Sequence, residues 1–185
     1  MATPTERTIT DRYVRLIRKA TPAQLEAGSR WYDDARELAR TLVDIHNAQS
    51  WGELWTLDTA AAVIAAYSPN MRWSDNVRRA VAHASGQYVF GIYATPEKLA
   101  AIDTHGRGAL TGPKVTAFAA NIVGDEQAVT IDIWMARAAK LASDQPTPVQ
   151  YRTCVNALRK AAHRTGLTPA TAQAVIWCVI RGSEA

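Results

Sequence analysis

The chain has 185 residues, of which 48% are hydrophobic and 21% are charged, and its formal net charge is +4. This composition supports a sizeable core and excludes wholesale disorder, and the length predicts one domain, or two lobes around one core. Two cysteines and four scattered histidines cannot form a disulfide framework, a four-cysteine zinc site or an iron–sulfur cluster. No metal site is therefore predicted.

The sequence also excludes a membrane protein. No apolar run approaches the roughly 18 residues of a membrane-spanning helix, and the N-terminal segment lacks the apolar stretch of a secretory signal. A cytoplasmic protein without a membrane partner is expected. Basic side chains gather in 72–79 and in 151–164, and the second segment contains no acidic residue. The positive charge of these segments should weakly attract polyanions such as nucleic acid.

Hydrophobic periodicity predicts helices along the whole chain and no strand. The first two helices are expected over 5–19, which is basic and amphipathic, and over about 22–48, which Pro22 opens. The run TAAAVIAAY (59–67) is apolar on all sides, so it predicts a buried helix with Asp58 or Thr59 as its N-cap.

The second half of the chain continues in the same way, and the caps and breakers set the helix ends. Helices are expected over 74–85, over EKLAAI (97–102) after a Thr95 cap, and from Pro113 to Gly124. Further helices start near Asp132, with Thr130 as the N-cap, and span 147–165 and 168–181. The sequence thus predicts an all-α domain of about eight to ten helices covering 1–185.

Residues 106–142 carry the most specific chemical pattern. Gly106, Gly108 and Gly112 predict a flexible entry to the helix that Pro113 opens, and such a helix start suits a phosphate. Lys114 lies in its first turn, where the helix dipole disfavours a cation and favours the neutral amine that a nucleophile requires. Asp132, 18 residues later, lies at a helix start that stabilises its anion. A solvent-exposed lysine and a capping aspartate are the plain structural alternative.

The order of these features resembles the helix-hairpin-helix DNA glycosylase superfamily, which contains endonuclease III and the 8-oxoguanine glycosylases. LTGPKVTAFAANIVG (110–124) is similar to the second half of the family's hairpin and its exit helix, and VTIDIWMAR (129–137) is similar to its aspartate segment. The spacing of 18 residues also agrees with the family. Residues 61–80 and 94–102 look like the segments that precede the hairpin, so the resemblance covers about 55–145.

The resemblance implies a two-lobed all-α glycosylase-like fold without an iron–sulfur cluster. Residues 55–145 form its core, and the helices of 1–54 and 146–185 complete the lobes. The short, cluster-free chain also looks like small members of this fold that bacteriophages encode. In that case the protein acts in the host cytoplasm.

The resemblance also implies roles for individual residues. Lys114 matches the lysine that forms a Schiff base with the sugar, and Asp132 matches the aspartate that assists the nucleophile and stabilises positive charge on the sugar. Leu110, Thr111 and Gly112 match the hairpin that holds a phosphate through backbone amides, often with a monovalent cation. No other cofactor is implied.

Further residues are expected around the DNA. Asn76 matches a polar helix residue near the lesion, and Arg72, Arg159 and Lys160 are basic candidates for contacts with DNA. The family flips the target nucleotide out of the stack into a pocket between the lobes. Asn70, Trp73 and Trp134 are the main candidates for that pocket or for a wedge in the DNA, and other candidate aromatics are Trp31, Trp51 and Trp55.

Three positions depart from the family pattern. Leu110 stands where the hairpin has a glycine, Trp134 stands where a histidine is usual, and Ser68-Pro69-Asn70 replaces the glutamine wedge of endonuclease III-like proteins. Because of these departures, the resemblance does not identify the target base.

The sequence therefore predicts a DNA N-glycosylase with AP-lyase activity on a modified or damaged base. One alternative is an enzyme of the same fold that acts on hypermodified phage bases. Another is a catalytically silent helix-hairpin-helix module that binds DNA or a protein. The sequence leaves open whether the target is DNA or RNA, whether it is single- or double-stranded, and the oligomeric state.

Overall fold

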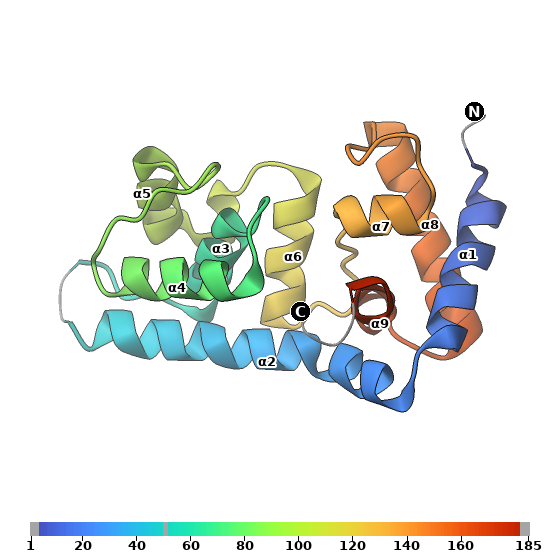
Figure 1. Ribbon diagram of the computed structural model, residues 1–185. Helices are drawn as coiled ribbons and strands as arrows, with labels where there is room; N and C mark the ends of the chain where they lie inside the picture. Colours follow the sequence, from blue (N-terminus) through green and yellow to red (C-terminus); the bar gives the residue numbers. More distant parts are fainter. Residues whose placement is uncertain (1–3, 50–51, 182–185) are drawn as a thin grey trace. The chain divides into compact units, whose positions relative to one another are not determined.

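The computed structural model describes residues 4–49 and 52–181, and the regular secondary structure in this part of the chain is all helical (Figure 1). It contains nine α-helices, one short 3-10 helix and no strand, which confirms the predicted all-α class. The elements are α1 (Glu6–Lys19), α2 (Pro22–Asn47), α3 (Leu57–Tyr67), α4 (Trp73–Ala84), α5 (Pro96–His105), η1 (Gly106–Ala109), α6 (Pro113–Val123), α7 (Ile133–Ala138), α8 (Pro148–Thr165) and α9 (Pro169–Arg181).

The chain forms two compact units. Unit 1 comprises Met1–Tyr32 and Asp125–Ala185, and unit 2 comprises Asp33–Gly124. The first boundary falls within α2, and the second follows the end of α6. The predicted glycosylase-like core of 55–145 therefore contains most of unit 2 and the start of the second segment of unit 1.

Unit 1 is built on α1, which packs against α8 and α9, while α7 packs against α9. Its core contains large apolar side chains from all four helices, among them Ile9, Met135, Leu158 and Ile176. Cys154 and Cys178 are free and buried, as their type predicts. Arg12 of α1 donates a hydrogen bond of 2.6 Å to the carbonyl of Ala139 and so holds the C-terminal end of α7.

Unit 2 is built around α3. Every residue of α3 from Thr59 to Tyr67 is buried, as the apolar composition of this run predicts. The helix contacts α4, α5, η1 and α6. Because most of these side chains are alanines, neighbouring helices can approach α3 closely, and α6 lies directly against it.

Two predicted N-caps are wrong, and in both cases the backbone shows why. Thr56, not Asp58 or Thr59, caps α3: it has an extended backbone, and its hydroxyl accepts the Thr59 N–H. Asp132, not Thr130, caps α7, since Thr130 is buried and the Asp132 side chain accepts the Met135 N–H. In each case the cap is the residue whose extended conformation directly precedes the helix.

Candidate functional site

The segment around Lys114 consists of a helix, a turn and a second helix. It runs from α5 through η1 and Leu110–Gly112 into α6. Gly112 has φ 101° and ψ 134°, a conformation that favours glycine, and its carbonyl accepts hydrogen bonds from the N–H and hydroxyl of Thr116. Pro113 follows at the first helical position, as predicted, so Lys114 is the second residue of α6. Lys114 is half-buried, whereas Thr111 is exposed.

The entry to this turn is fixed by contacts with α3 and α5, in contrast to the flexible loop that the glycines predict. The Asp58 carboxylate of α3 accepts the backbone N–H of Arg107 at 2.7 Å and also binds the Arg107 guanidinium. Lys98 of α5 donates its ammonium to the Ala109 carbonyl at 3.0 Å. A Cβ on Gly106 would clash with Asp58 Oδ2, and the backbone there has φ 54°, a conformation that favours glycine.

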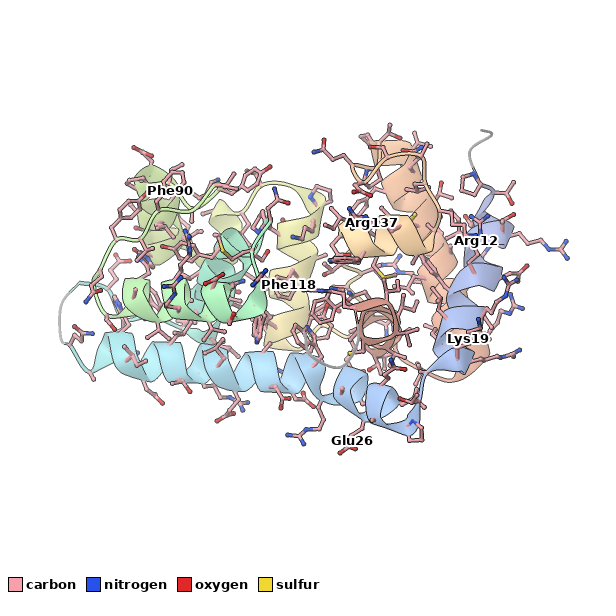
Figure 2. All side chains as sticks on the ribbon, in the orientation of Figure 1. Arg12, Lys19, Glu26, Phe90, Phe118 and Arg137 are labelled. Carbon is pink, nitrogen blue, oxygen red and sulfur yellow. The ribbon has the colours of Figure 1, made fainter. Side chains whose placement is uncertain are left out.

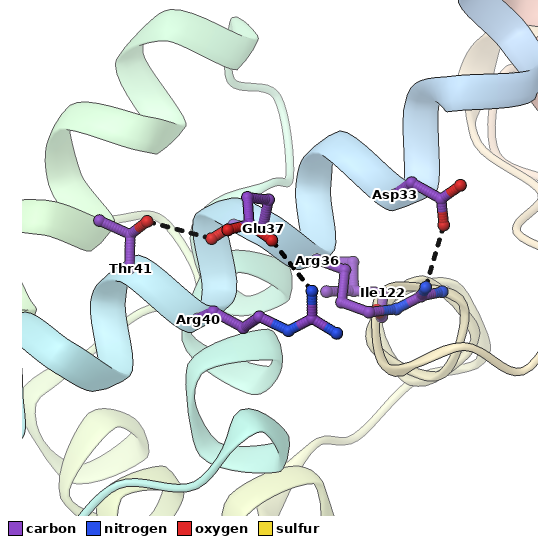
Figure 3. A network of polar contacts seen from close by, with 6 residues as sticks. All are labelled: Asp33, Arg36, Glu37, Arg40, Thr41 and Ile122. Carbon is purple, nitrogen blue, oxygen red and sulfur yellow. Dashed lines mark hydrogen bonds and ion pairs between the residues drawn. The ribbon is translucent and has the colours of Figure 1, made fainter.

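The far end of α6 is held by α2 (Figure 3). Arg36 Nε donates to the Ile122 carbonyl in the last turn of α6 at 2.9 Å, and the same guanidinium pairs with Asp33 at 2.9 Å. Gly124 ends the helix in the left-handed conformation, with φ 111°. An arginine that binds the last carbonyls of a helix satisfies acceptors that have no partner within the helix. The orientation of α6, and with it the position of Lys114, is therefore fixed at both ends.

Asp132 lies in unit 1, at the start of α7. Its Oδ1 accepts the Met135 N–H at 2.9 Å, and the side chain is half-buried. The buried Tyr13 donates its hydroxyl to the Met135 carbonyl at 3.1 Å, and burial raises the pKa of Tyr13 well above its usual value, so this phenol remains a donor. The Asp132 carboxylate is thus held in one orientation by the cap of a short, well-anchored helix.

Trp134 belongs to a group of interleaved aromatic and cationic side chains within unit 1. The Arg137 and Arg181 guanidinium carbons lie 4.8 Å and 5.4 Å from its ring centroid. Arg181 also lies 4.8 Å from the Trp177 ring, which in turn lies 4.7 Å from the ring of Trp31. Sequence reasoning named two of these tryptophans separately, and it missed Trp177 and the two arginines.

The other predicted contacts in unit 2 lie around the start of α4. Arg72 is exposed and directly precedes the helix, Asn70 is exposed in the preceding turn with φ 56°, and Trp73 is half-buried. Asn76 is only 2% exposed and donates from Nδ2 to the Ile64 carbonyl of α3 at 3.1 Å. Its side chain joins α4 to α3, so it does not enter the proposals below.

The basic residues of α8, which the sequence suggests as DNA contacts, are exposed, but most of them bind other groups of the protein. Lys160 pairs with Glu6 of α1 at 2.5 Å, and Arg164 pairs with Asp11 at 2.7 Å. Arg159 donates to the Gln127 carbonyl, a neutral acceptor, at 3.4 Å. Much of the positive charge of this helix therefore faces acids of α1.

Trp55 is a core residue of unit 2. Its ring is stacked on His46, with centroids 4.3 Å apart, and it lies 5.4 Å from the ring of His83. The amide of Asn47 binds both the N–H and the carbonyl of the Trp55 backbone. This residue is a packing residue, not a surface wedge. Trp51 lies outside the residues that the structure describes.

An exposed apolar segment between α4 and α5 has no counterpart in the sequence-based prediction. Tyr88, Phe90, Ile92 and Tyr93 are between 51% and 67% exposed (Figure 2). The backbone beneath them is anchored, since the hydroxyl of Tyr67 donates to the Val89 carbonyl at 3.0 Å. The signal in the sequence is the complete absence of Asp, Glu, Lys and Arg from residues 80–96.

The described residues hold neither a metal-binding cluster nor a membrane-spanning helix. Residues 4–49 and 52–181 contain no group of three or more His, Cys, Asp or Glu side chains that could hold a metal ion. No helix within these ranges is both long enough and apolar enough to span a bilayer.

Comparisons with known proteins give a family but no activity. Neither the comparison with curated proteins nor the comparison with solved structures gives a significant match. The model of one family, described as a family of unknown function, matches residues 1–184 and therefore nearly the whole chain. The chain belongs to this family of unknown function, DUF7178.

Proposed function

We propose that this protein binds DNA and excises a modified base, with Lys114 as the nucleophile. The observation that carries the proposal is the placement of Lys114 in the first turn of a helix that is held at both ends. Asp58 and Lys98 bind the segment that enters α6, and Arg36 binds the last turn. A nucleophile needs such a fixed position, because its advantage over a free amine comes from orientation.

The proposed reaction begins when the neutral amine of Lys114 attacks C1′ of the target nucleotide. A bond from Nζ to C1′ forms as the bond from C1′ to the base breaks, and the base leaves with the bonding electrons and takes up a proton. Opening of the sugar gives a Schiff base, which permits β-elimination of the 3′ phosphate. This step requires the neutral form of the amine.

Asp132 is assigned the role of stabilising positive charge on the sugar as the base departs. A carboxylate acts best in this way when its orientation is set before the reaction, since little reorganisation is then needed. The hydrogen bond from the Met135 N–H to Oδ1 supplies such an orientation.

The hairpin remains compatible with phosphate binding despite its leucine. Leu110 has φ −73° and ψ 138°, an extended conformation that any residue adopts, so the glycine of the family pattern is not needed for the backbone at this position. Thr111 and Gly112 are exposed. We propose that their backbone amides contact a phosphate, with a monovalent cation as an additional ligand of the turn.

Borohydride trapping tests the proposal. The protein is mixed with oligonucleotides that contain uracil, 8-oxoguanine, hydroxymethyluracil or an abasic site, and borohydride reduces any Schiff base to a stable adduct. We expect an adduct with at least the abasic substrate, lost in Lys114→Ala and retained in Lys19→Ala, which removes an exposed lysine at the end of α1. An adduct that survives Lys114→Ala, or no adduct with any substrate, contradicts this function.

A binding module without catalysis is the second candidate, and the exposed segment Tyr88–Tyr93 favours it. Four large apolar side chains on an anchored backbone are typical of a surface that contacts another protein. For such a module we expect no adduct with any substrate, and replacement of Phe90 by serine should leave the folded state intact.

A further inference from the structure

Aromatic and cationic side chains alternate on one surface of unit 1. We call Trp31, Trp134, Trp177, Arg137 and Arg181 the Trp–Arg cluster. Its members come from α2, α7 and α9, and neighbouring members lie between 4.7 and 5.4 Å apart, measured from ring centroids to the next ring centroid or guanidinium carbon. The three tryptophans are half-buried and the two arginines are exposed.

Arg181 is the central cation of the cluster. Its guanidinium carbon lies within cation–π distance of both Trp134 and Trp177. Packing against rings occupies the faces of a guanidinium and leaves the N–H donors at its edge for an anion. No carboxylate within residues 4–49 and 52–181 pairs with Arg181, whereas Arg137 has a bidentate pair with Asp144.

The net positive charge of the protein resides in the same unit. Unit 1 has thirteen Lys and Arg residues against eight Asp and Glu, a net charge of +5. Unit 2 has eight against nine, a net charge of −1. The long-range field of unit 1 therefore attracts a polyanion. Lys160 and Arg164 of α8 contribute less to it, because they pair with acids of α1.

We infer that the Trp–Arg cluster binds single-stranded nucleic acid. Unpaired bases stack on the exposed parts of the tryptophan rings, and a backbone phosphate contacts the edge of Arg181. A single strand fits this surface better than a duplex, because duplex bases are already stacked and offer no open faces. The inference rests on the proposed function for the choice of nucleic acid over other polyanions, but it requires neither Lys114 nor Asp132.

The test measures the affinity of the full chain for fluorescent oligothymidylate and oligouridylate of about 12 nucleotides, within the usual range of site sizes, and for a blunt DNA duplex. Arg181→Ala and Trp134→Leu should each weaken single-strand binding about tenfold or more, because the first loses a phosphate contact and the second loses a stacked base. Arg181→Lys keeps the charge, so it should weaken binding while preserving the salt dependence. Arg18→Ala, an exposed arginine of α1, is the control for loss of one charge and should change affinity by less than about threefold.

Circular dichroism and thermal melting identify any variant that fails to fold. If Trp134→Leu does not fold, Arg181→Ala still tests the inference, because Arg181 is exposed and its replacement should not disturb the core. The inference is overturned if Arg181→Ala binds as Arg18→Ala does, if the duplex competes as well as the single strand, or if no oligonucleotide binds. The two oligonucleotides distinguish DNA from RNA. If binding depends on the Trp–Arg cluster but no borohydride adduct forms, this inference stands and the proposed catalysis is wrong. If an adduct forms but Arg181→Ala does not change binding, the proposed catalysis stands and this inference is wrong.

Discussion

Single polar side chains determine the backbone around Lys114. Asp58 binds the N–H of a residue 49 positions later in the sequence, and Arg36 binds a carbonyl 86 positions later. Each contact satisfies a backbone group near the end of a helix that has no partner within that helix. Loss of such a contact should cost more than loss of an ordinary surface ion pair, and matched pairs of variants can measure the difference.

Arg36→Ala should lower the free energy of unfolding by about 1–2 kcal/mol, because it leaves the Ile122 carbonyl without its charged donor. Arg40→Ala is the matched control, since both arginines lie on α2 and pair with an acid three residues earlier. The control should cost no more than about 0.5 kcal/mol. Urea unfolding followed by circular dichroism measures both values, and equal losses would show that Arg36 acts only through its pair with Asp33.

Gly106→Ala should destabilise the protein by about 2 kcal/mol or more. The new Cβ would meet the Asp58 carboxylate that holds η1, and the backbone at φ 54° is unfavourable for alanine. Gly108→Ala is the control, because no atom lies within 4 Å of its added Cβ and its φ is not positive. The control should fall within about 0.5 kcal/mol of the parent protein. A neutral Gly106→Ala would mean that η1 can shift away from Asp58 without cost.

Asp132→Asn separates the proposed catalytic charge from the structural cap. Asparagine caps a helix about as well as aspartate, so the melting temperature should stay close to that of the parent protein. Excision should fall about 10²–10³-fold with DNA affinity nearly unchanged, since only an interaction with the transition state is lost. Asp132→Ala should additionally lose about 1 kcal/mol of stability. Single-turnover excision and DNA binding measure the two effects, and an unchanged rate in Asp132→Asn removes Asp132 from the mechanism.

Helices as units follow closely from local sequence. Pro22, Pro113 and Pro169 mark helix starts, and Gly124 and Gly166 mark helix ends, within one or two residues of the predicted limits. These signals depend on the conformation of one residue and are therefore visible in the sequence. The cap of α7 was assigned wrongly because both Thr130 and Asp132 are good capping residues, and only burial of Thr130 decides between them.

The contacts that connect helices were not predictable in the same way. The sequence predicts Arg36 to be an ordinary solvent-exposed arginine of a long helix. No nearby residue indicates that its side chain contacts the end of α6. The Trp–Arg cluster likewise brings together residues from the N-terminal and C-terminal parts of the chain. Such pairs depend on how the helices pack, and one sequence by itself carries no direct record of that packing.

The attachment of α1 to α8 should weaken in acid. A hydrogen bond from Lys160, together with its charge, lowers the pKa of Glu6, and a hydrogen bond and charge from Arg164 lower the pKa of Asp11. Because both carboxyl groups have a lowered pKa in the folded state, they stabilise that state at pH values above their unfolded pKa values of 4.5 and 3.8. This stabilisation is lost as the pH falls through the lowered pKa values of the folded state. The ion pairs are partly exposed, so salt should reduce their effect.

Glu6→Gln combined with Asp11→Asn should therefore melt at a lower temperature than the parent protein at pH 7 in low salt. The gap between the two melting temperatures should close at low pH, as the pH falls through the lowered folded pKa values and the parent protein also loses these charges. Glu26→Gln, at an exposed position of α2 that Figure 2 labels, is the control and should show no such pH-dependent gap. A gap of the same size at pH 7 and at low pH would show that the substitutions act through packing rather than charge.

The chain as a whole divides its charge unequally, and this division has a measurable consequence for DNA binding. Unit 1 carries a net charge of +5 and unit 2 a net charge of −1. Because phosphate contacts release counterions, the dependence of affinity on salt reports how many basic side chains contact the nucleic acid. We therefore expect basic side chains of unit 1 to account for most of the salt dependence. Removal of the same number of positive charges from unit 2 should affect it less, although the net charge of the protein changes equally.

Arg159→Ala combined with Lys160→Ala should flatten the salt dependence of DNA affinity, whereas Arg40→Ala combined with Arg78→Ala in unit 2 should not. Both pairs remove two positive charges, and all four side chains are exposed. We expect the slope of log affinity against log salt to fall by about 1 in the first variant, because each phosphate contact contributes about 0.9 and Lys160 already pairs with Glu6. Fluorescence anisotropy over a series of salt concentrations gives the slopes. Equal slopes in the two variants would mean that α8 does not contact DNA, and that total charge alone governs its attraction.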